Sequence, residues 1–246
     1  MLDFAVSLCY FSLLKFTQMI SENVKYVTER IARSCEKARR RPEDVRLICV
    51  TKTASVVEIE EVLSSGVRLL GENRVRDAIA RRASIGDRAE WHMVGHLQAN
   101  KAKDAVKIFS LIHSVDSVRL AKEIDKEAEK IGKVQDILIQ VNTSGEASKS
   151  GIEPGAAEDF IREAAEYRNI SIKGLMTIAP EVDDPEKVRP YFRALRELRD
   201  KIASSAPVAP PRNDGGWILS MGMTNDFEAA IEEGSNMVRI GRAVFG

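Results

Sequence analysis

Beyond residue 20, the chain alternates between short, almost continuous apolar runs and charged segments in which apolar residues recur at helical spacing. Short runs of this kind are typical of strands buried on both faces of a parallel sheet. The runs that predict strands are Val45–Thr51, Val67–Gly71, Trp91–Gly95, Leu111–Val115, Asp136–Val141, Ile170–Ile178, Trp217–Met221 and Met237–Ile240. The segments that predict helices are Glu22–Arg40, Val56–Ser64, Val75–Ala83, Val118–Ile131, Ala156–Arg168, Glu186–Ala203 and Asp226–Glu233.

This alternation predicts an α/β fold, a single (β/α)8 TIM barrel preceded by an extra helix. An open doubly wound sheet stays an alternative, because periodicity cannot show that a sheet closes. No GxGxxG motif follows the first predicted strand, so the main sign of a dinucleotide-binding fold is missing. The Pro- and Gly-rich stretch Ser204–Gly216 predicts a loop and not a domain boundary.

The chain has 246 residues, a normal length for one such barrel and enough for a core without disulfide or metal support. We expect residues 1–19 to be an extension outside the core and residues 20–246 to be the barrel domain. The apolar stretch Phe4–Leu14 is shorter than the about 20 residues that cross a bilayer. It also lacks the basic start and cleavage site of a secretory signal, so we expect no membrane association.

Charge and cysteine content narrow the functional classes. Lys plus Arg and Asp plus Glu are both 37, a balance that argues against a nucleic-acid or acidic-membrane binder. Cys9, Cys35 and Cys49 lie far apart without a CxxC pair, so a reducing, cytoplasmic setting is expected.

Function in a barrel gathers at the carboxyl ends of its strands, where the first predicted strand is followed by Lys52. A lysine there must be paired or desolvated, and a desolvated amine with a lowered pKa is a nucleophile for a Schiff base. The alternative is a lysine that extends from the barrel mouth into water.

Histidines near the next strands predict no metal site. His92 and His96 are four residues apart, but such a pair converges only on a helix, and this segment predicts a strand and a turn. His113 is expected to be a hydrogen-bonded histidine of the core or rim. The polar clusters Gly71–Arg74 and Gly95–Lys101 lie at the same predicted rim.

The segments Ser220–Thr224 and Arg239–Arg242 follow the last two predicted strands. The corresponding loops of many barrels bind phosphate through glycine amides and a helix N-terminus, and a serine hydroxyl can add a donor. The alternative is that the glycines only turn the chain. A phosphate site facing a lysine across one mouth makes pyridoxal 5′-phosphate (PLP) the ligand to test.

Seven motifs carry a resemblance to a known family: CVTKT, GENRV, WHMVGHLQANK, QVNTSGEASKSG, KGLMTI, LSMGMTNDFEAAIEEGS and VRIGRAVFG. Over Ile20 to Gly246 the chain resembles the YggS/PROSC family of PLP homeostasis proteins. The resemblance implies a single-domain barrel like the N-terminal domain of bacterial alanine racemase, holding PLP, with a role in intracellular vitamin B6 homeostasis.

The resemblance also implies roles for individual residues. Lys52 matches the lysine that forms the Schiff base, Arg239 the arginine that faces the pyridine nitrogen, and Asn73 a rim position near the cofactor. The implied phosphate cradle consists of Ser220, Met221, Gly222, Met223, Gly241 and Arg242, the last two chiefly through backbone amides.

A cation beside the ring nitrogen disfavours its protonation and weakens the electron sink that stabilises a carbanion. Racemases of this barrel type add a second domain with a further acid/base, which we do not expect this sequence to supply. The resemblance therefore implies a PLP regulator or carrier with little or no turnover and no catalytic residues. A weak PLP-dependent racemase or lyase, or a barrel whose Lys52 contacts a sugar phosphate, stays open. The expected partners are PLP and PLP-dependent apo-enzymes, with a monomer as the expected state.

The chain departs from the family at one place. The family often has VSKTKP where this chain has Val50-Thr51-Lys52-Thr53-Ala54-Ser55, so the second lysine is missing. Because that competing amine is absent, Lys52 is the lysine of this segment that we expect to react with the aldehyde. The segment Ser148–Gly151 matches the family too, and the sequence indicates no physical role for it.

Overall fold

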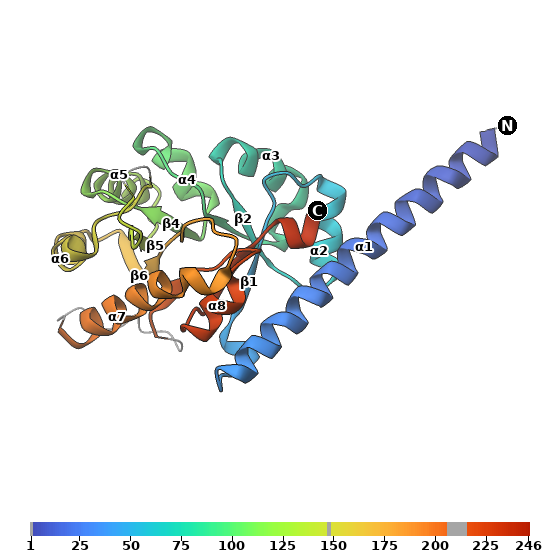
Figure 1. The fold of residues 1–246 in the computed structure, drawn as a ribbon. Helices are drawn as coiled ribbons and strands as arrows, with labels where there is room; N and C mark the ends of the chain where they lie inside the picture. Colours follow the sequence, from blue (N-terminus) through green and yellow to red (C-terminus); the bar gives the residue numbers. More distant parts are fainter. Residues whose placement is uncertain (1, 147–148, 206–215) are drawn as a thin grey trace.

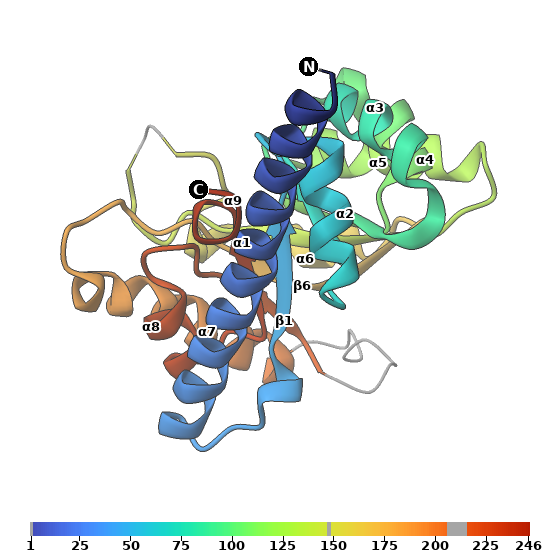
Figure 2. The same ribbon diagram turned by 90° about the vertical axis from the view of Figure 1, so that its right-hand side faces the viewer.

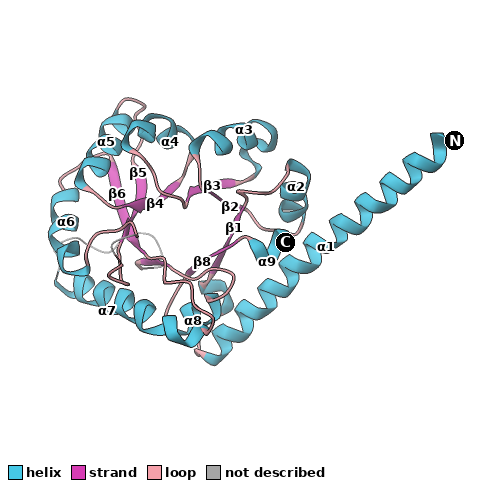
Figure 3. Cartoon of the chain, turned by 45° about the horizontal axis from the view of Figure 1, so that its top comes forward, coloured by secondary structure: helices cyan, strands magenta, loops and turns pink. Residues whose placement is uncertain are grey.

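The computed structural model describes residues 2–146, 149–205 and 216–246. Within these residues, eight parallel strands form a closed barrel in the order β1 to β8, with β8 hydrogen-bonded to β1 (Figure 3). The strands are β1 (Arg46–Val50), β2 (Leu69–Glu72), β3 (Glu90–Met93), β4 (Leu111–Val115), β5 (Gln135–Gln140), β6 (Ile170–Met176), β7 (Ile218–Ser220) and β8 (Met237–Ile240). The predicted strands and the barrel are confirmed, and the open sheet is wrong.

Helices surround the barrel (Figure 3). They are α2 (Val56–Ser64), α3 (Val75–Ile85), α4 (Ala102–Ile108), α5 (Val118–Glu129), α6 (Ala157–Ala164), α7 (Arg189–Ser205), α8 (Phe227–Glu232) and α9 (Arg242–Phe245). Short 3-10 turns are η1 (Pro42–Asp44), η2 (Gly86–Arg88), η3 (Ala99–Lys101), η4 (Pro154–Ala156) and η5 (Pro185–Val188). The sequence pattern did not predict α4 and α9, because one or two helical turns are too short to show a period.

The extra N-terminal helix is α1 (Leu2–Lys37), which begins well before the predicted Glu22. No glycine or proline interrupts residues 1–41, so nothing in the sequence stops the helix earlier. Figure 1 shows its first half extending away from the barrel, and Figure 2 shows it crossing the barrel's outside, where it contacts α2, α8 and α9. Ile20 is fully buried, next to a half-exposed Met19. The division into residues 1–19 and 20–246 stays a prediction.

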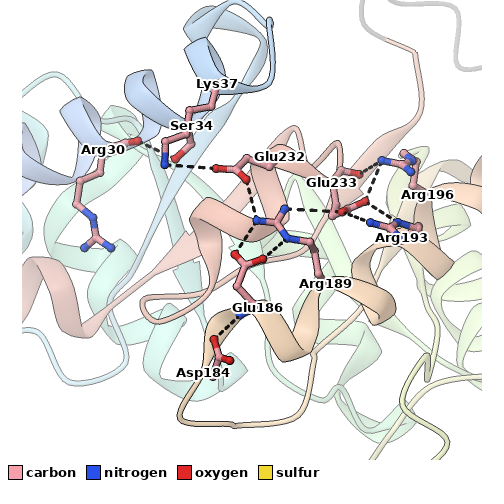
Figure 4. Close-up of polar contacts among 10 residues, drawn as sticks. All are labelled: Arg30, Ser34, Lys37, Asp184, Glu186, Arg189, Arg193, Arg196, Glu232 and Glu233. Carbon is pink, nitrogen blue, oxygen red and sulfur yellow. Dashed lines mark hydrogen bonds and ion pairs between the residues drawn. The ribbon is translucent and has the colours of Figure 1, made fainter.

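An outer network of charges joins α7 and η5 to the end of α8 (Figure 4). Glu233, whose side chain is 6% exposed, pairs with Arg193 at 2.8 Å and with Arg196 at 3.0 Å. Arg189 pairs with Glu186 and with Glu232. Although burial acts to raise the pKa of the Glu233 carboxyl, the three arginines lower it below its ordinary value. We call these six side chains the outer network.

The barrel interior is partly apolar and partly polar. Its apolar cluster consists of Ile48, Leu111, Leu138, Met176, Ile218 and Met237. Beside it, His92, His113, Ser220 and Arg239 are all at most 4% exposed. Buried polar groups are costly unless they are hydrogen-bonded, so these four require partners inside the barrel.

Two predicted segments fall partly outside the described residues. Of the predicted loop Ser204–Gly216, residues 206–215 lie outside them, and Ser204 and Ser205 end α7. Of the segment Ser148–Gly151, Ser148 lies outside them as well. Within the described ranges, none of the helices combines the length and the hydropathy needed to cross a bilayer.

Candidate cofactor site at the carboxyl end of the barrel

The register of neighbouring strands brings the predicted site residues to one rim. Val50 pairs with Gly71, so Lys52 and Asn73 follow their strands at the same level. Cys49 pairs with Ile240, which places Gly241 and Arg242 beside the turn that carries Lys52. The structure thus assembles residues from β1, β2, β7 and β8 around one mouth.

Lys52 lies in the turn that follows β1, and its side chain is exposed. Among the described residues no ion pair to its ammonium is present. The expectation that this amine is buried or paired is therefore wrong, because β1 ends at Val50 and the lysine stands beyond the packed interior. The amine is free to meet a ligand that enters the mouth.

A buried network fixes the backbone of that turn. The side chain of Glu72 is fully buried and accepts hydrogen bonds from Thr51 and from Arg81 at 2.9 Å. Arg81 also donates to the carbonyls of Lys52 and Ala54. Burial raises the pKa of the Glu72 carboxyl, while Thr51 and the Arg81 charge act in the opposite direction. From the sequence, Glu72 is expected only as a member of the polar cluster Gly71–Arg74 at the rim.

Arg239 is held firmly inside the mouth. Its Nη1 donates to Ser220 Oγ at 2.7 Å and its Nη2 to the carbonyl of Thr177 at 2.9 Å. Burial lowers the pKa of this guanidinium to about 10, against the attraction of the Asp226 carboxylate. The group is therefore still a cation at neutral pH, with a fixed orientation.

Ser220 contacts two side chains of the barrel interior, and its role toward a phosphate stays a prediction. Its hydroxyl is fully buried and lies between Arg239 and His113 Nδ1, which is 2.9 Å away. Thr224, in the loop after β7, is half-buried, and its hydroxyl makes no hydrogen bond within the described part of the chain. Strand alternation points the last residue of β7 inward and leaves the Thr224 hydroxyl in the loop at the rim.

The loop after β7 requires a glycine at position 222. Gly222 has φ +95°, and a Cβ there would lie 2.6 Å from the Cβ of Ala230. The loop's amides are partly used already: Met223 N donates to Asp226 Oδ1 at 2.6 Å and Met221 N to the Met237 carbonyl. The amides of Met221 and Met223 thus have acceptors within the protein, and their role toward a phosphate stays a prediction.

The loop after β8 keeps its amides accessible. Gly241 is the N-cap of α9, and no side chain caps that helix. The first amides of a helix have no acceptor within it, so those of Arg242 and Ala243 can bind an anion. The side chain of Arg242 points elsewhere and pairs with Glu181 at 3.5 Å.

The expected hydrogen-bonded His113 is confirmed, and its partners are unexpected. His113 Nε2 lies 3.1 Å from His92 Nδ1, and His92 Nε2 lies 3.1 Å from Glu90 Oε1. Burial lowers the pKa of His113 well below its ordinary value, and the neighbouring His92 and Arg239 act in the same direction. His96 is exposed and lies near Asp116, so it does not converge with His92.

Comparisons with known proteins agree with this geometry. The family described as "Alanine racemase, N-terminal domain" matches residues 27–246. The pyridoxal phosphate homeostasis protein of Aquifex aeolicus is 44% identical over 226 residues, covering 92% of this chain and 96% of the relative. The chain belongs to the pyridoxal phosphate homeostasis protein family.

Two solved structures are similar to this family member. PipY of Synechococcus elongatus, solved with PLP bound, is 33% identical with a TM-score of 0.76, covering 88% of this chain and all of PipY. Alanine racemase of Clostridium difficile has a TM-score of 0.70 at 19% identity. The match covers 95% of this chain and 57% of the racemase, and it shows the shared fold alone.

The opposite end of the barrel carries a second opening. A cavity of about 800 Å³ lies at the amino ends of the strands, and Arg46, Glu90, His92 and Asp136 are among the residues that line it. In this family member His92 lines the amino-end cavity and also contacts His113 in the barrel interior.

Proposed function

We propose that this protein binds PLP at the carboxyl-end mouth, with Lys52 forming a Schiff base, and that it buffers or delivers the cofactor with little or no turnover. The observation that carries the proposal is the fixed, buried guanidinium of Arg239 on β8, at the same end of the barrel as the exposed Lys52 that follows the neighbouring strand β1. Such a pair can serve the two ends of one ring, the nitrogen and the aldehyde.

The residues present fit the chemistry of the cofactor. The Lys52 amine has no competing ion pair among the described residues, and the backbone that carries it is fixed by Arg81. The uncapped start of α9 and the Thr224 hydroxyl supply donors for a phosphate. The half-exposed side chains of Ile178 and Met223 provide apolar surface at the same mouth.

Arg239 argues for binding over turnover. When bound, PLP supplies an electron sink whose strength depends on a protonated ring nitrogen. Because the guanidinium keeps its own proton at neutral pH, it would present a positive charge to that nitrogen. A second proton close by is disfavoured, so the chain's own residues hold the cofactor in a form that is poor at stabilising a carbanion.

We further propose a monomer that acts in the cytoplasm and supplies PLP-dependent apo-enzymes. The buried, unpaired thiols of Cys35 and Cys49 suit a reducing compartment. The neutral net charge gives no electrostatic attraction to one class of partner.

The test is a visible absorption spectrum of the purified protein with added PLP, followed by borohydride reduction and peptide mapping. We expect a Schiff-base band that is trapped on Lys52 and is lost in Lys52→Ala. Lys122→Ala, which removes an exposed lysine of α5, is the matched control and should leave the band unchanged.

Two results would contradict this proposal. A colourless protein that stays unmodified would favour a plain phosphate-binding barrel. Loss of the α-hydrogen of an amino acid at a catalytic rate, abolished by Lys52→Ala, would favour the racemase or lyase alternative.

A further inference from the structure

Five side chains form one unbroken line through the barrel, which we call the interior line: Arg239, Ser220, His113, His92 and Glu90. Successive contacts along it measure 2.7, 2.9, 3.1 and 3.1 Å. The line starts at the carboxyl-end mouth on β8 and ends at the amino-end cavity on β3. The contacts proposed for the cofactor use neither histidine.

With both imidazoles neutral, the two ends of the interior line permit only one direction for its hydrogen bonds. A guanidinium has donors and no acceptor, so Arg239 must donate to Ser220. At the other end, the hydrogen bond from His92 lowers the pKa of Glu90 to about 2, against the effect of burial. Glu90 is therefore an ionised carboxylate, which only accepts, and His92 must donate to it from Nε2.

His113, at the middle of the line, is uncharged. His113 is fully buried and lies one hydroxyl away from the Arg239 cation, and both facts disfavour a second positive charge. A neutral imidazole has one donor and one acceptor. With His92 donating from Nε2, its Nδ1 accepts from His113 Nε2, and His113 Nδ1 in turn accepts from the hydroxyl of Ser220.

We propose that His113 and His92 are positioning residues of the cofactor site, both neutral with the proton on Nε2, which orient Arg239 through hydrogen bonds running one way from Arg239 to Glu90. This proposal rests on the proposed function, since the orientation of Arg239 matters only if Arg239 faces the bound cofactor. The Ser220 hydroxyl donates to His113, so its lone pair stays turned toward the guanidinium. The Thr177 carbonyl fixes the other Nη of Arg239.

The proton positions can be read in the protein without cofactor. The chain has three histidines, so ¹⁵N-labelled histidine gives a simple spectrum, and the exposed His96 serves as an internal reference. At pH 7.5 we expect His92 and His113 each to show one protonated Nε2 and one unprotonated Nδ1. A proton on Nδ1 of either ring, or an imidazolium at His92, would reverse the line and overturn the proposal.

The positioning role is tested with two variants of similar size. His113→Asn keeps an acceptor where Nδ1 lies, whereas His113→Leu leaves the Ser220 hydroxyl without one. We expect His113→Leu to weaken PLP binding about tenfold, the effect of one lost buried hydrogen bond, and to shift the pH titration of the bound chromophore. His113→Asn keeps the partner of Ser220 and loses only the contact to His92, so both measurements should lie between those of wild type and His113→Leu.

Thermal unfolding and borohydride trapping on Lys52 verify that both variants fold and load. If His113→Leu matches wild type in affinity and titration, the histidines do not position Arg239 and the proposal fails. If wild type itself takes up no PLP, the proposed function fails, and with it the role of the line toward a cofactor. The histidine spectrum then still decides the proton positions by itself.

Discussion

The interior line and the outer network use similar residues in opposite ways. The interior line places one charge at each end and three uncharged groups between them, all but Glu90 buried. The outer network sets charge directly against charge, and its arginines are 21% to 51% exposed. Removing ions from water costs several kcal/mol each, so neutral groups suit the barrel interior and paired charges suit its surface.

The connectivity differs as well. Each inner member of the interior line has one neighbour on either side, so losing one member separates the two ends. In the outer network Glu233 contacts three arginines, so losing one leaves two. A linear arrangement transmits orientation, whereas a branched arrangement distributes stability.

The largest effect should come from reversing the charged end of the interior line. Arg239→Glu would replace a buried cation by a carboxylate in the field of the buried Asp226, and we expect a loss of about 3–5 kcal/mol in unfolding free energy, as for an uncompensated buried charge. Where the variant folds, the spectrum and titration of bound PLP should change, because a negative charge favours a protonated ring nitrogen. Arg239→Lys is the control that keeps the positive charge. An unchanged spectrum and titration in Arg239→Glu would refute the contact with the ring nitrogen.

A smaller but still large effect is expected at the middle of the line. Ser220→Val keeps the volume of the side chain and removes the hydroxyl shared by Arg239 and His113. Two buried groups lose a partner at about 1–3 kcal/mol each, so we expect a loss of about 2–4 kcal/mol in chemical denaturation. Ser84→Val, on the exposed face of α3, is the control, and an equal loss there would show that the hydroxyl contributes nothing specific.

The neutral histidine should appear in the pH dependence of stability. The unfolded chain binds a proton at His113 below about pH 6.5, whereas the folded chain does not, because burial lowers its pKa. The unfolded state then binds more protons, so stability falls as pH drops below 6.5, by at most about 1.4 kcal/mol per pH unit from this group. His113→Asn should lose that share of the slope. Parallel curves for wild type and variant between pH 6.5 and 5 would contradict a neutral His113.

The smallest effect is expected in the outer network. Arg193→Ala removes one of the three cations at Glu233, and the half-exposed arginine is screened by water. We expect a loss of less than about 1 kcal/mol in unfolding free energy. A loss as large as that of Ser220→Val would mean that the network also depends on single members.

The strands and the barrel could be predicted because strands covered on both faces appear in the sequence as uninterrupted apolar runs. Lys52 and Arg239 could be placed at one mouth because Lys52 directly follows such a run and Arg239 lies one residue before the end of another. The sequence left open whether Lys52 is buried or exposed, since that depends on β1 ending at Val50 and not at Thr51.

The interior line could not be predicted from the sequence, because it depends on which strands are neighbours. His92 and His113 face each other only because β3 and β4 are neighbours in a closed barrel, at a register that pairs His92 with Leu111. Ser220 was assigned to the phosphate from its position near glycines. Its side chain points inward because it is the last residue of β7, and the sequence pattern does not show where that strand ends.

The ladder between β1 and β8 has a consequence for the time at which this site comes into being. Lys52 follows the first strand to be synthesised, and Arg239 lies on the last. A ribosome-bound chain presents the amine long before the guanidinium and the α9 amides exist. The amine alone is an ordinary lysine toward an aldehyde, and selectivity appears only when the barrel closes. In the proposed function, cofactor capture is thus a late, post-synthetic event, and incomplete chains would lack the selectivity of the folded protein toward the vitamin pool.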